Sequence, residues 1–307
     1  MTVGALSQSD AIEVDDECLR RWRLPQPDAE GDKEERGRIL IIAGAREMPG
    51  AVILAANGAL HAGAGKLTVA TAESVAKLVA VMLPEARVIE LPETAAGGVA
   101  EGAIECVRQL FSRVDAVLIG PGMQDETAVC EFSTQVMANL SLPVLVLDAA
   151  ALGVVRQTSK APVFLSPTIL TPHAGELANL TGRSKDQVAA QPAKLAASAS
   201  RQWNAVVALK GATTFIASPA GSLWRHKGGN VGLAISGSGD VLAGVIAGLA
   251  ARGASAEQAA VWGVALHALA GERLASRTGP LGYLARDLSA EVPALMHRFA
   301  QSSNALE

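Results

Sequence analysis

Short apolar runs rich in β-branched residues alternate with longer, alanine-rich amphipathic stretches along most of the chain. Six runs have the length and composition of buried strands: residues 39–42, 67–71, 116–119, 144–147, 168–171 and 205–209. The stretches between them are long enough to form helices. This alternation predicts an α/β fold in which helices cover both faces of a central, mostly parallel sheet, giving three α/β/α layers.

The pattern changes after residue 212. A Pro-Ala-Gly turn signal at residues 219–221 separates two strand-like pieces, 213–217 and 222–226, so we expect a β-hairpin at one edge of the sheet. Beyond the hairpin we expect three helices, at residues 240–252, 256–277 and 285–298. Gly253 follows the first of these helices and fits a helix C-terminus.

The first 36 residues differ from the rest of the chain. They end in a charged run, residues 28–36, and they lack the basic segment followed by an apolar one that a secretory signal needs. We therefore expect a helical arm and a solvated lead-in over residues 1–36, one domain over residues 37–300 and a tail over residues 301–307. The same observation predicts a cytoplasmic protein.

Composition narrows the classes of function. Half of the 307 residues are apolar, which supports a large core and excludes a globally disordered chain. With 26 Lys and Arg against 30 Asp and Glu, the net charge is −4, so we expect neither nucleic acid nor a membrane as a partner. Cys18, Cys106 and Cys130 contain no CxxC pair, which fits idle thiols better than disulfides or structural zinc.

A glycine-rich turn leads into the first of the three C-terminal helices. Gly237, Ser238 and Gly239 precede Asp240 and an apolar helical run. Free N–H groups and the helix dipole form an anion site at such a position, and glycines let a phosphate approach the backbone. A carboxylate there repels phosphate unless it accepts the proton of a hydroxyl that attacks the phosphorus. Asp240 is therefore either that base or an ordinary helix N-cap.

Other polar residues follow predicted strands, at the edge where open α/β sheets bind ligands. After the run 205–209 come Lys210, Gly211, Ala212, Thr213 and Thr214, which offer an ammonium, amides and hydroxyls to one ligand. This composition suits a nucleotide. A hairpin turn with a solvated lysine is the alternative interpretation.

Three more strand ends carry candidate residues. After the run 168–171, His173 is either structural or part of a site, and Glu176 either complements a helix dipole or holds water around Mg²⁺. Asp148 and Gly122 follow two other runs, and Ala51 closes the loop after the first. The sequence contains no GxxxxGK[ST], GxGxxG, HExxH or GxSxG pattern, which disfavours common NTPases, dehydrogenases, metalloproteases and esterases.

Taken in order, five segments carry a family resemblance. They begin with GRILIIAGAREMPGA and continue with LIGPGM, ILTPHAGELANLTG, VVALKGATTFIASPAG and ISGSGDVLAGVIAGLAARG. Together, from about Arg38 to Met296, they resemble the ADP-dependent NAD(P)H-hydrate dehydratase family. The TPHxGE and GSGDxLxG patterns at this spacing carry most of the resemblance.

The resemblance implies a ribokinase-like fold and an enzyme that repairs nicotinamide cofactors. Members dehydrate the 6S hydrate of NADH or NADPH, use ADP, usually with Mg²⁺, and release AMP and phosphate. The family tendency to form tetramers favours a homo-oligomer. The epimerase domain that is often fused to this family has no room in residues 1–36, so the resemblance implies a separate epimerase acting on the same metabolite.

The resemblance also implies roles for individual residues. Asp240 would be the base, and the amides of Gly237, Ser238 and Gly239 would stabilise the transferred phosphoryl group. The segment from Lys210 to Thr214, together with Gly239, would hold the adenine nucleotide. The hydrated dinucleotide would be contacted by the following residues: Ala51, Gly122, His173 and Asp240.

Three positions depart from the family pattern. Ala150 stands where a second carboxylate is common, Ser236 where a smaller residue is usual, and Arg286 where a small polar residue is usual. Two alternatives therefore stay open at this point. One is an ATP-dependent kinase of the same fold that phosphorylates a vitamin-precursor alcohol, and the other is a nucleotide-binding protein without turnover.

Overall fold

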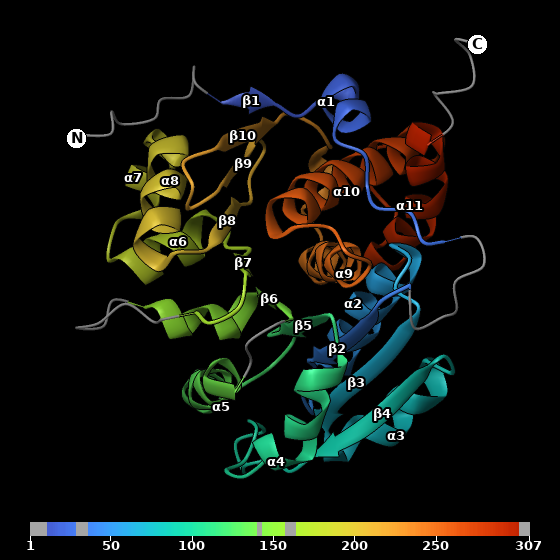
Figure 1. Cartoon of the computed structure of the whole chain (residues 1–307), viewed down its shortest axis with the longest axis vertical. Coiled ribbons are helices and arrows are strands. Elements are labelled where there is room, and N and C mark those ends of the chain that lie inside the picture. Colours follow the sequence, from blue (N-terminus) through green and yellow to red (C-terminus); the bar gives the residue numbers. More distant parts are fainter. Residues whose placement is uncertain (1–10, 29–35, 140–142, 157–163, 301–307) are drawn as a thin grey trace.

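The computed structural model describes residues 11–28, 36–139, 143–156 and 164–300. Its strands form one sheet in the order β1-β10-β9-β8-β7-β6-β5-β2-β3-β4 (Figure 1). They are β1 (Ile12–Glu13), β2 (Arg38–Ile42), β3 (Lys66–Ala72), β4 (Ala86–Leu91), β5 (Ala116–Ile119), β6 (Val144–Leu147), β7 (Thr168–Leu170), β8 (Val206–Leu209), β9 (Thr214–Ala217) and β10 (Leu223–His226). The predicted tail 301–307 and most of the charged lead-in lie outside the described residues.

The sheet confirms the predicted pattern, with two differences. All six apolar runs are strands, and every pair is parallel except β8–β9 and β9–β10. The hairpin exists as β9 and β10, but its expected place at the edge is wrong, because β1 pairs in parallel with β10 and places Ile12 opposite Trp224. The sequence analysis also missed β4, whose apolar run is interrupted by Arg87 and Glu90.

Helices cover both faces of the sheet. They are α1 (Asp16–Arg21), α2 (Pro49–His61), α3 (Glu73–Met82), α4 (Ile104–Val107), α5 (Glu126–Asn139), α6 (Ala174–Thr181), α7 (Lys185–Ala190), α8 (Pro192–Trp203), α9 (Ser238–Ala251), α10 (Ala256–Thr278) and α11 (Ala285–Ala300). The three C-terminal helices are confirmed, although the first begins at Ser238, two residues earlier than expected. The helix expected in the N-terminal arm is α1.

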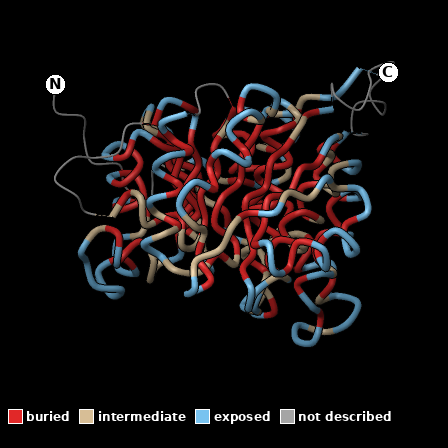
Figure 2. The backbone as a smooth tube through the Cα atoms, turned by 90° about the horizontal axis from the view of Figure 1, so that it is seen from below, coloured by how far each residue is buried: buried red, intermediate tan, exposed pale blue. Residues whose placement is uncertain are grey.

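Alternation along each strand divides the core into two layers. In β2, Ile39 and Ile41 belong to the core layer that α2, α9, α10 and α11 also line, whereas Leu40 and Ile42 belong to the layer lined by α5, α6 and α8. Both sets are fully buried, and Figure 2 shows buried chain throughout the interior. The predicted three-layer architecture follows from this alternation.

Helix α9 lies deep in the molecule, between α2 and α10 (Figure 1). A Cβ atom at Gly244 would lie 2.0 Å from the carbonyl oxygen of Ala55, and one at Gly248 would lie 2.5 Å from that of Ala59. These glycines therefore let the backbones of α2 and α9 approach more closely than any side chain allows. The contact fixes where the N-terminus of α9 meets the sheet.

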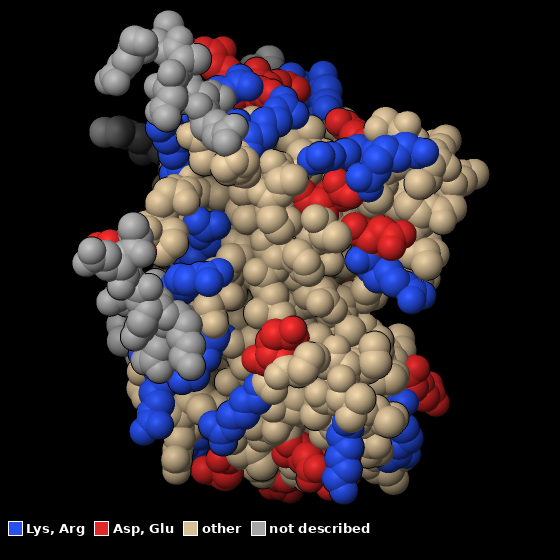
Figure 3. All heavy atoms as spheres, turned by 90° about the vertical axis from the view of Figure 1, so that its right-hand side faces the viewer, with Lys and Arg blue, Asp and Glu red and all other residues tan. Residues whose placement is uncertain are grey.

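The surface mixes charges. On the face shown in Figure 3, acidic and basic side chains are interspersed among uncharged ones. Within the described residues, no helix is both long enough and apolar enough to cross a membrane.

We predict that Gly244→Val lowers the free energy of unfolding by about 1–3 kcal/mol or more, because the added atoms have no space against Ala55. Chemical denaturation measures the change. Gly50→Ala is the matched control on α2, since nothing lies within 4 Å of its Cβ position, and should change stability by less than about 1 kcal/mol. Equal stability of the two variants would contradict the close packing of α2 and α9.

Candidate active site

The order of strands reverses between β2 and β5, because the chain builds outward from β2 to β4 and from β5 to β8 in opposite directions. Ligands bind outside the carboxyl ends of strands at such a switch point. Here the Gly44 N–H donates to the Pro121 carbonyl oxygen at 2.8 Å. A Cβ at Gly122, whose φ is +66°, would lie 2.4 Å from Ala51 Cβ. Ala51 and Gly122, predicted separately, are thus in contact.

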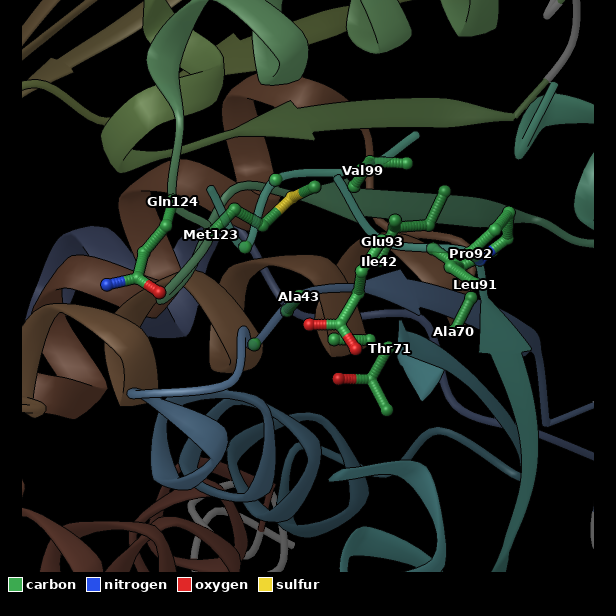
Figure 4. Close-up of a pocket in the computed structure, with 14 residues that line it drawn as sticks. Ile42, Ala43, Ala70, Thr71, Leu91, Pro92, Glu93, Val99, Met123 and Gln124 are labelled. Carbon is green, nitrogen blue, oxygen red and sulfur yellow. The ribbon is translucent and has the colours of Figure 1, made fainter. Parts of the chain in front are cut away.

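A narrow cavity lies beside this contact, between the ends of β2, β3 and β4 and the turn after β5. Its volume is about 10 Å³, about enough for one water molecule. Figure 4 shows Met123 and Gln124 on one side of it and Leu91 and Pro92 on the other. The cavity opens next to the loop that leads into Ala51.

Two polar contacts hold that loop in place. Glu93, almost fully buried, accepts the Ser74 N–H at 2.8 Å and lies 3.3 Å from the Arg46 guanidinium. Burial opposes the charge of Glu93, but Ser74 and Arg46 outweigh it, so the pKa of this carboxyl is lowered. Gln124 donates to Glu47 at 2.8 Å. The loop between β2 and α2 is therefore tied at two points to neighbouring strand ends.

A second group of polar residues lies at the ends of β6, β7 and β8. Lys210 Nζ donates to Asp148 Oδ1 at 2.8 Å, and the Thr171 hydroxyl donates to the same oxygen at 2.7 Å. Glu176 Oε2 lies 4.0 Å from Lys210 Nζ. Burial disfavours the ammonium, but the carboxylates of Asp148, Glu176 and Asp240 outweigh burial and raise the pKa of Lys210. Lys210 is therefore a fixed positive charge.

His173 caps helix α6. Its Nδ1 accepts the backbone N–H groups of Gly175 and Glu176 at 3.0 and 3.1 Å. The backbone N–H of His173 donates to Glu176 Oε2 at 2.7 Å. His173 and Glu176 thus form a capping box at the start of α6, and their contacts with a ligand stay predictions. Because Nδ1 accepts, the ring hydrogen is assigned to Nε2, and the exposed ring edge remains able to contact a ligand.

The N-terminus of α9 faces the same group. Gly237 occupies the N-cap position with a φ of +88°, and no side chain caps the helix. The N-cap interpretation of Asp240 is therefore wrong, because Asp240 lies within the first turn. A Cβ at Gly239 would lie 3.7 Å from Lys210 Nζ, so the glycine-rich turn and the lysine meet as predicted.

Asp240 has an unusual acidity. Burial, followed by the nearby charge of Asp148, raises its pKa from 3.8 to about 7, against the opposing effect of Lys210. A carboxyl with a pKa near neutrality can exchange protons efficiently with a reacting group. The site thus places a proton acceptor, an ammonium and free helix amides together.

The remaining predicted residues lie around this group. Gly211 and Ala212 are exposed in the turn between β8 and β9, and the Thr214 hydroxyl donates to the Gly211 carbonyl at 3.2 Å. Thr213 is half-buried in the same turn. The turn is joined to the His173 segment, since the Lys210 N–H donates to the Pro172 carbonyl at 2.8 Å.

The three departures lie at the periphery or behind the site. Ala150 is half-buried in a 3₁₀ helix after β6, while Ser236 and Arg286 are exposed at the starts of α9 and α11. The described residues contain no group of three or more potential metal ligands. A water-mediated contact of Glu176 with Mg²⁺, which usually keeps several of its waters, stays a prediction.

Sequence reasoning missed two polar residues of the site. Thr171 was assigned only to a strand, although it donates to Asp148. His267 on α10 lies 3.0 Å from Ser238 and was hidden in a predicted helix. For Thr171 the place at a strand end was an available signal, whereas nothing in the helical pattern distinguishes His267.

We predict that Lys210→Met lowers the free energy of unfolding by about 3–5 kcal/mol, because it leaves the buried Asp148 carboxylate without its cation. Denaturant unfolding measures the loss. Arg108→Met is the control, since its pair with Glu105 is exposed, and should change stability by less than about 1 kcal/mol. A similar small change in both variants would show that the Lys210–Asp148 pair does not stabilise the fold.

Comparisons with known proteins agree over most of the chain. The family model for NAD(P)H-hydrate dehydratase matches residues 39–294. An ADP-dependent (S)-NAD(P)H-hydrate dehydratase from Xanthomonas campestris is 47% identical over 281 residues, which cover 92% of this chain and 94% of the relative.

Solved structures share the fold. The ADP/ATP-dependent NAD(P)H-hydrate dehydratase from Bacillus subtilis, co-crystallised with ATP/Mg²⁺, has a TM-score of 0.81 at 32% identity, covering 94% of this chain and 99% of that one. A ribokinase-like superfamily protein from Enterococcus faecalis has a TM-score of 0.82 at 26% identity, covering 97% and 100% of the two chains. The predicted ribokinase-like fold is confirmed, and the chain belongs to the NAD(P)H-hydrate dehydratase family.

Proposed function

We propose that this protein is an ADP-dependent dehydratase that converts the 6S hydrate of NADH or NADPH back to the intact cofactor, releasing AMP and phosphate. The relative from Xanthomonas campestris carries the same activity in its name. One observation in this chain carries the proposal: Asp240, with a pKa of about 7, lies in the first turn of α9 beside the Lys210 ammonium.

The reaction begins with phosphoryl transfer. The ring hydroxyl of the hydrated cofactor attacks the terminal phosphorus of ADP while Asp240 accepts the hydroxyl proton, and the bond to the bridging oxygen breaks to release AMP. The phosphorylated hydroxyl then leaves as phosphate, and loss of a proton from the adjacent ring carbon restores the double bond. Conversion of a poor leaving group, hydroxide, into phosphate is what the nucleotide contributes.

The N-terminus of α9 is suited to bind the transferred phosphoryl group. The N–H groups of Gly237 and Gly239 lie at the positive end of the helix dipole, whereas the Ser238 N–H donates to the Ile235 carbonyl oxygen at 3.2 Å. Such donors stabilise the negative charge that develops on phosphoryl oxygens in the transition state. The nearby Lys210 ammonium adds to this field, and the turn through Gly211, Ala212, Thr213 and Thr214 is available to the nucleoside.

The hydrated dinucleotide fits the switch point. Ala51 has only a methyl group and Gly122 has no side chain where two loops touch, which leaves backbone within reach of a ligand. The exposed edge of His173 faces the same carboxyl end of the sheet and would orient the substrate rather than bind metal. Fixing the ring hydroxyl near Asp240 and the phosphorus lowers the barrier by proximity, by roughly 7–11 kcal/mol at best.

Mg²⁺ bound to the nucleotide would neutralise charge on its phosphates. The Bacillus subtilis relative was crystallised with ATP/Mg²⁺. In this chain, Glu176 is the half-buried carboxylate placed to hold water on such an ion. Its Oε2 already accepts an N–H from His173, so we assign it a water-mediated role only.

We also propose the cellular setting of the enzyme. Residues 37–300 would form the catalytic domain of a cytoplasmic homo-oligomer, with a tetramer as the form to test by light scattering. Exposed apolar side chains on α3, Leu78, Val81 and Met82, support association. Because the Xanthomonas relative is named for the S epimer, an epimerase would supply that epimer from the R form.

We predict that Asp240→Asn lowers the rate of NADH recovery from hydrated NADH by about 10²–10⁴-fold while ADP binding is retained, because the base is lost but the amides remain. Nicotinamide absorbance follows the reaction with ADP and Mg²⁺. Asp186→Asn, in the first turn of the distant helix α7, is the control and should leave the rate unchanged.

Failure of the wild-type protein to restore NADH, beside an active control dehydratase, would overturn the proposed function. A stable phosphorylated alcohol in place of free phosphate would identify a kinase. Near-normal turnover by Asp240→Asn would show that another group is the base.

We predict that kcat/KM rises with pH through a single ionisation near pH 7, because Asp240 accepts a proton only when it is deprotonated. Asp148→Asn should move this ionisation to lower pH, since the Asp148 charge raises the pKa of Asp240. A pH–rate profile of both proteins from about pH 5 to 9 measures the shift. An ionisation at the same pH in the variant would contradict the assignment to Asp240.

A further inference from the structure

A half-buried histidine supports the start of α9. His267 belongs to α10, and its Nε2 lies 3.0 Å from Ser238 Oγ and 3.0 Å from the Ser238 carbonyl oxygen. Ser238 is the first residue of α9 and is only 4% exposed. The hydroxyl and carbonyl oxygens of Ser238 therefore meet one ring nitrogen.

This geometry assigns the ring hydrogen. A carbonyl oxygen can only accept a hydrogen bond, so a nitrogen 3.0 Å from it must carry a hydrogen. If the hydrogen were on Nδ1 instead, two lone pairs would face each other at Nε2. His267 is thus in the Nε2–H form, and its N–H is shared between the carbonyl and hydroxyl oxygens of Ser238.

The surroundings keep the ring uncharged. Burial lowers the pKa of His267 to about 4, and the Lys210 ammonium adds to this, against the hydrogen bond to the Ser238 backbone. A neutral ring cannot serve as a general acid near neutral pH, nor can it add positive charge for phosphate. Its contribution to the site is therefore that Nε2 donates a hydrogen bond to Ser238 rather than accepting one.

That direction determines what the Ser238 hydroxyl can do. A hydroxyl has one hydrogen and two lone pairs, and here one lone pair is used by His267. The hydroxyl hydrogen is therefore not donated to the ring and remains free for a different acceptor. Ser238 lies between Gly237 and Gly239, among the amides that would surround the phosphoryl group.

We propose that His267 is a positioning residue that holds the Ser238 hydroxyl as a hydrogen-bond donor to the terminal phosphoryl group of the nucleotide. The inference rests on the proposed function and deepens it, because it adds a side-chain donor to the backbone amides of the same site. With the Nδ1–H form of the ring, the Ser238 hydroxyl would donate to Nε2 and would present only lone pairs to phosphate oxygens, which would repel them.

Kinetics of three variants test the inference. Ser238→Ala should lower kcat by about 10²-fold, the effect of removing one donor to a developing charge. His267→Phe should lower kcat in the wild-type background but cause little further loss in the Ser238→Ala background, because it acts through that hydroxyl. His267→Gln retains an N–H donor and should recover part of the loss. His61→Gln, at the far end of α2, is the control and should retain full activity.

A second measurement does not depend on turnover. Nitrogen-15 NMR of the ligand-free protein should show His267 in the Nε2–H form, unchanged between about pH 5.5 and 8, and Ser238→Ala and His267→Phe should each weaken ADP binding measured by calorimetry. The Nδ1–H form, an imidazolium at neutral pH, or equal losses from His267→Phe in both backgrounds would overturn the inference.

The two proposals fail in different ways. A protein that never restores NADH, yet shows the Nε2–H form and coupled losses of ADP affinity, would overturn the dehydratase function and leave the role of His267 standing. A fully active dehydratase in which His267→Phe causes the same loss with and without Ser238→Ala would support the dehydratase function and overturn the role of His267. If His267→Phe does not fold, the ring form and the Ser238→Ala variant still decide the question.

Discussion

The ion pair between Lys210 and Asp148 is the interaction on which the candidate site depends. It joins the ends of β8 and β6, takes a second hydrogen bond from Thr171 on the intervening segment, and places the ammonium near Glu176 and the start of α9. Burial raises the pKa of Asp240 most, and the same pair adjusts it, since Asp148 raises this pKa further and Lys210 opposes the rise. One contact thus organises both a positive pocket for phosphate and a base that works near neutrality.

The packing of the helices makes this arrangement possible, and the buried Asp240 makes the stability of the fold depend on pH. Close packing of α9 against α2 fixes the helix N-terminus at the carboxyl edge of the sheet, so the amides need no rearrangement to receive an anion. Asp240 binds its proton more tightly in the folded protein than in the unfolded chain, because its pKa is raised from 3.8 to about 7. Its contribution to the free energy of unfolding therefore falls as pH rises from about 4 to about 7. A destabilised carboxyl of this kind is typical of functional sites.

Much of the fold could be predicted from sequence because buried parallel strands are short apolar runs, and Ile39 to Ile42 is such a run. The edge strand β4 could not, since Arg87 and Glu90 face out and break the run, and β1 is only two residues long. In the site, Lys210, His173 and Asp240 were identified as residues at strand ends or a glycine-rich turn. The pairing of these residues could not be predicted, because Asp148 and Lys210 are 62 residues apart and meet only through the order of strands in the sheet. His267 was hidden because a polar residue inside a helix carries no signal of what it faces.

The central claim is that the start of α9 and Lys210 together bind a migrating phosphoryl group. The most direct measurement is a crystal structure of the protein with ADP and Mg²⁺. The account predicts that the terminal phosphorus lies against the amides of Gly237, Ser238 and Gly239, within reach of the Lys210 ammonium, with Asp240 facing the side from which a hydroxyl attacks. A terminal phosphorus bound elsewhere on the protein, with residues 237–240 left without contact to the nucleotide, would contradict it.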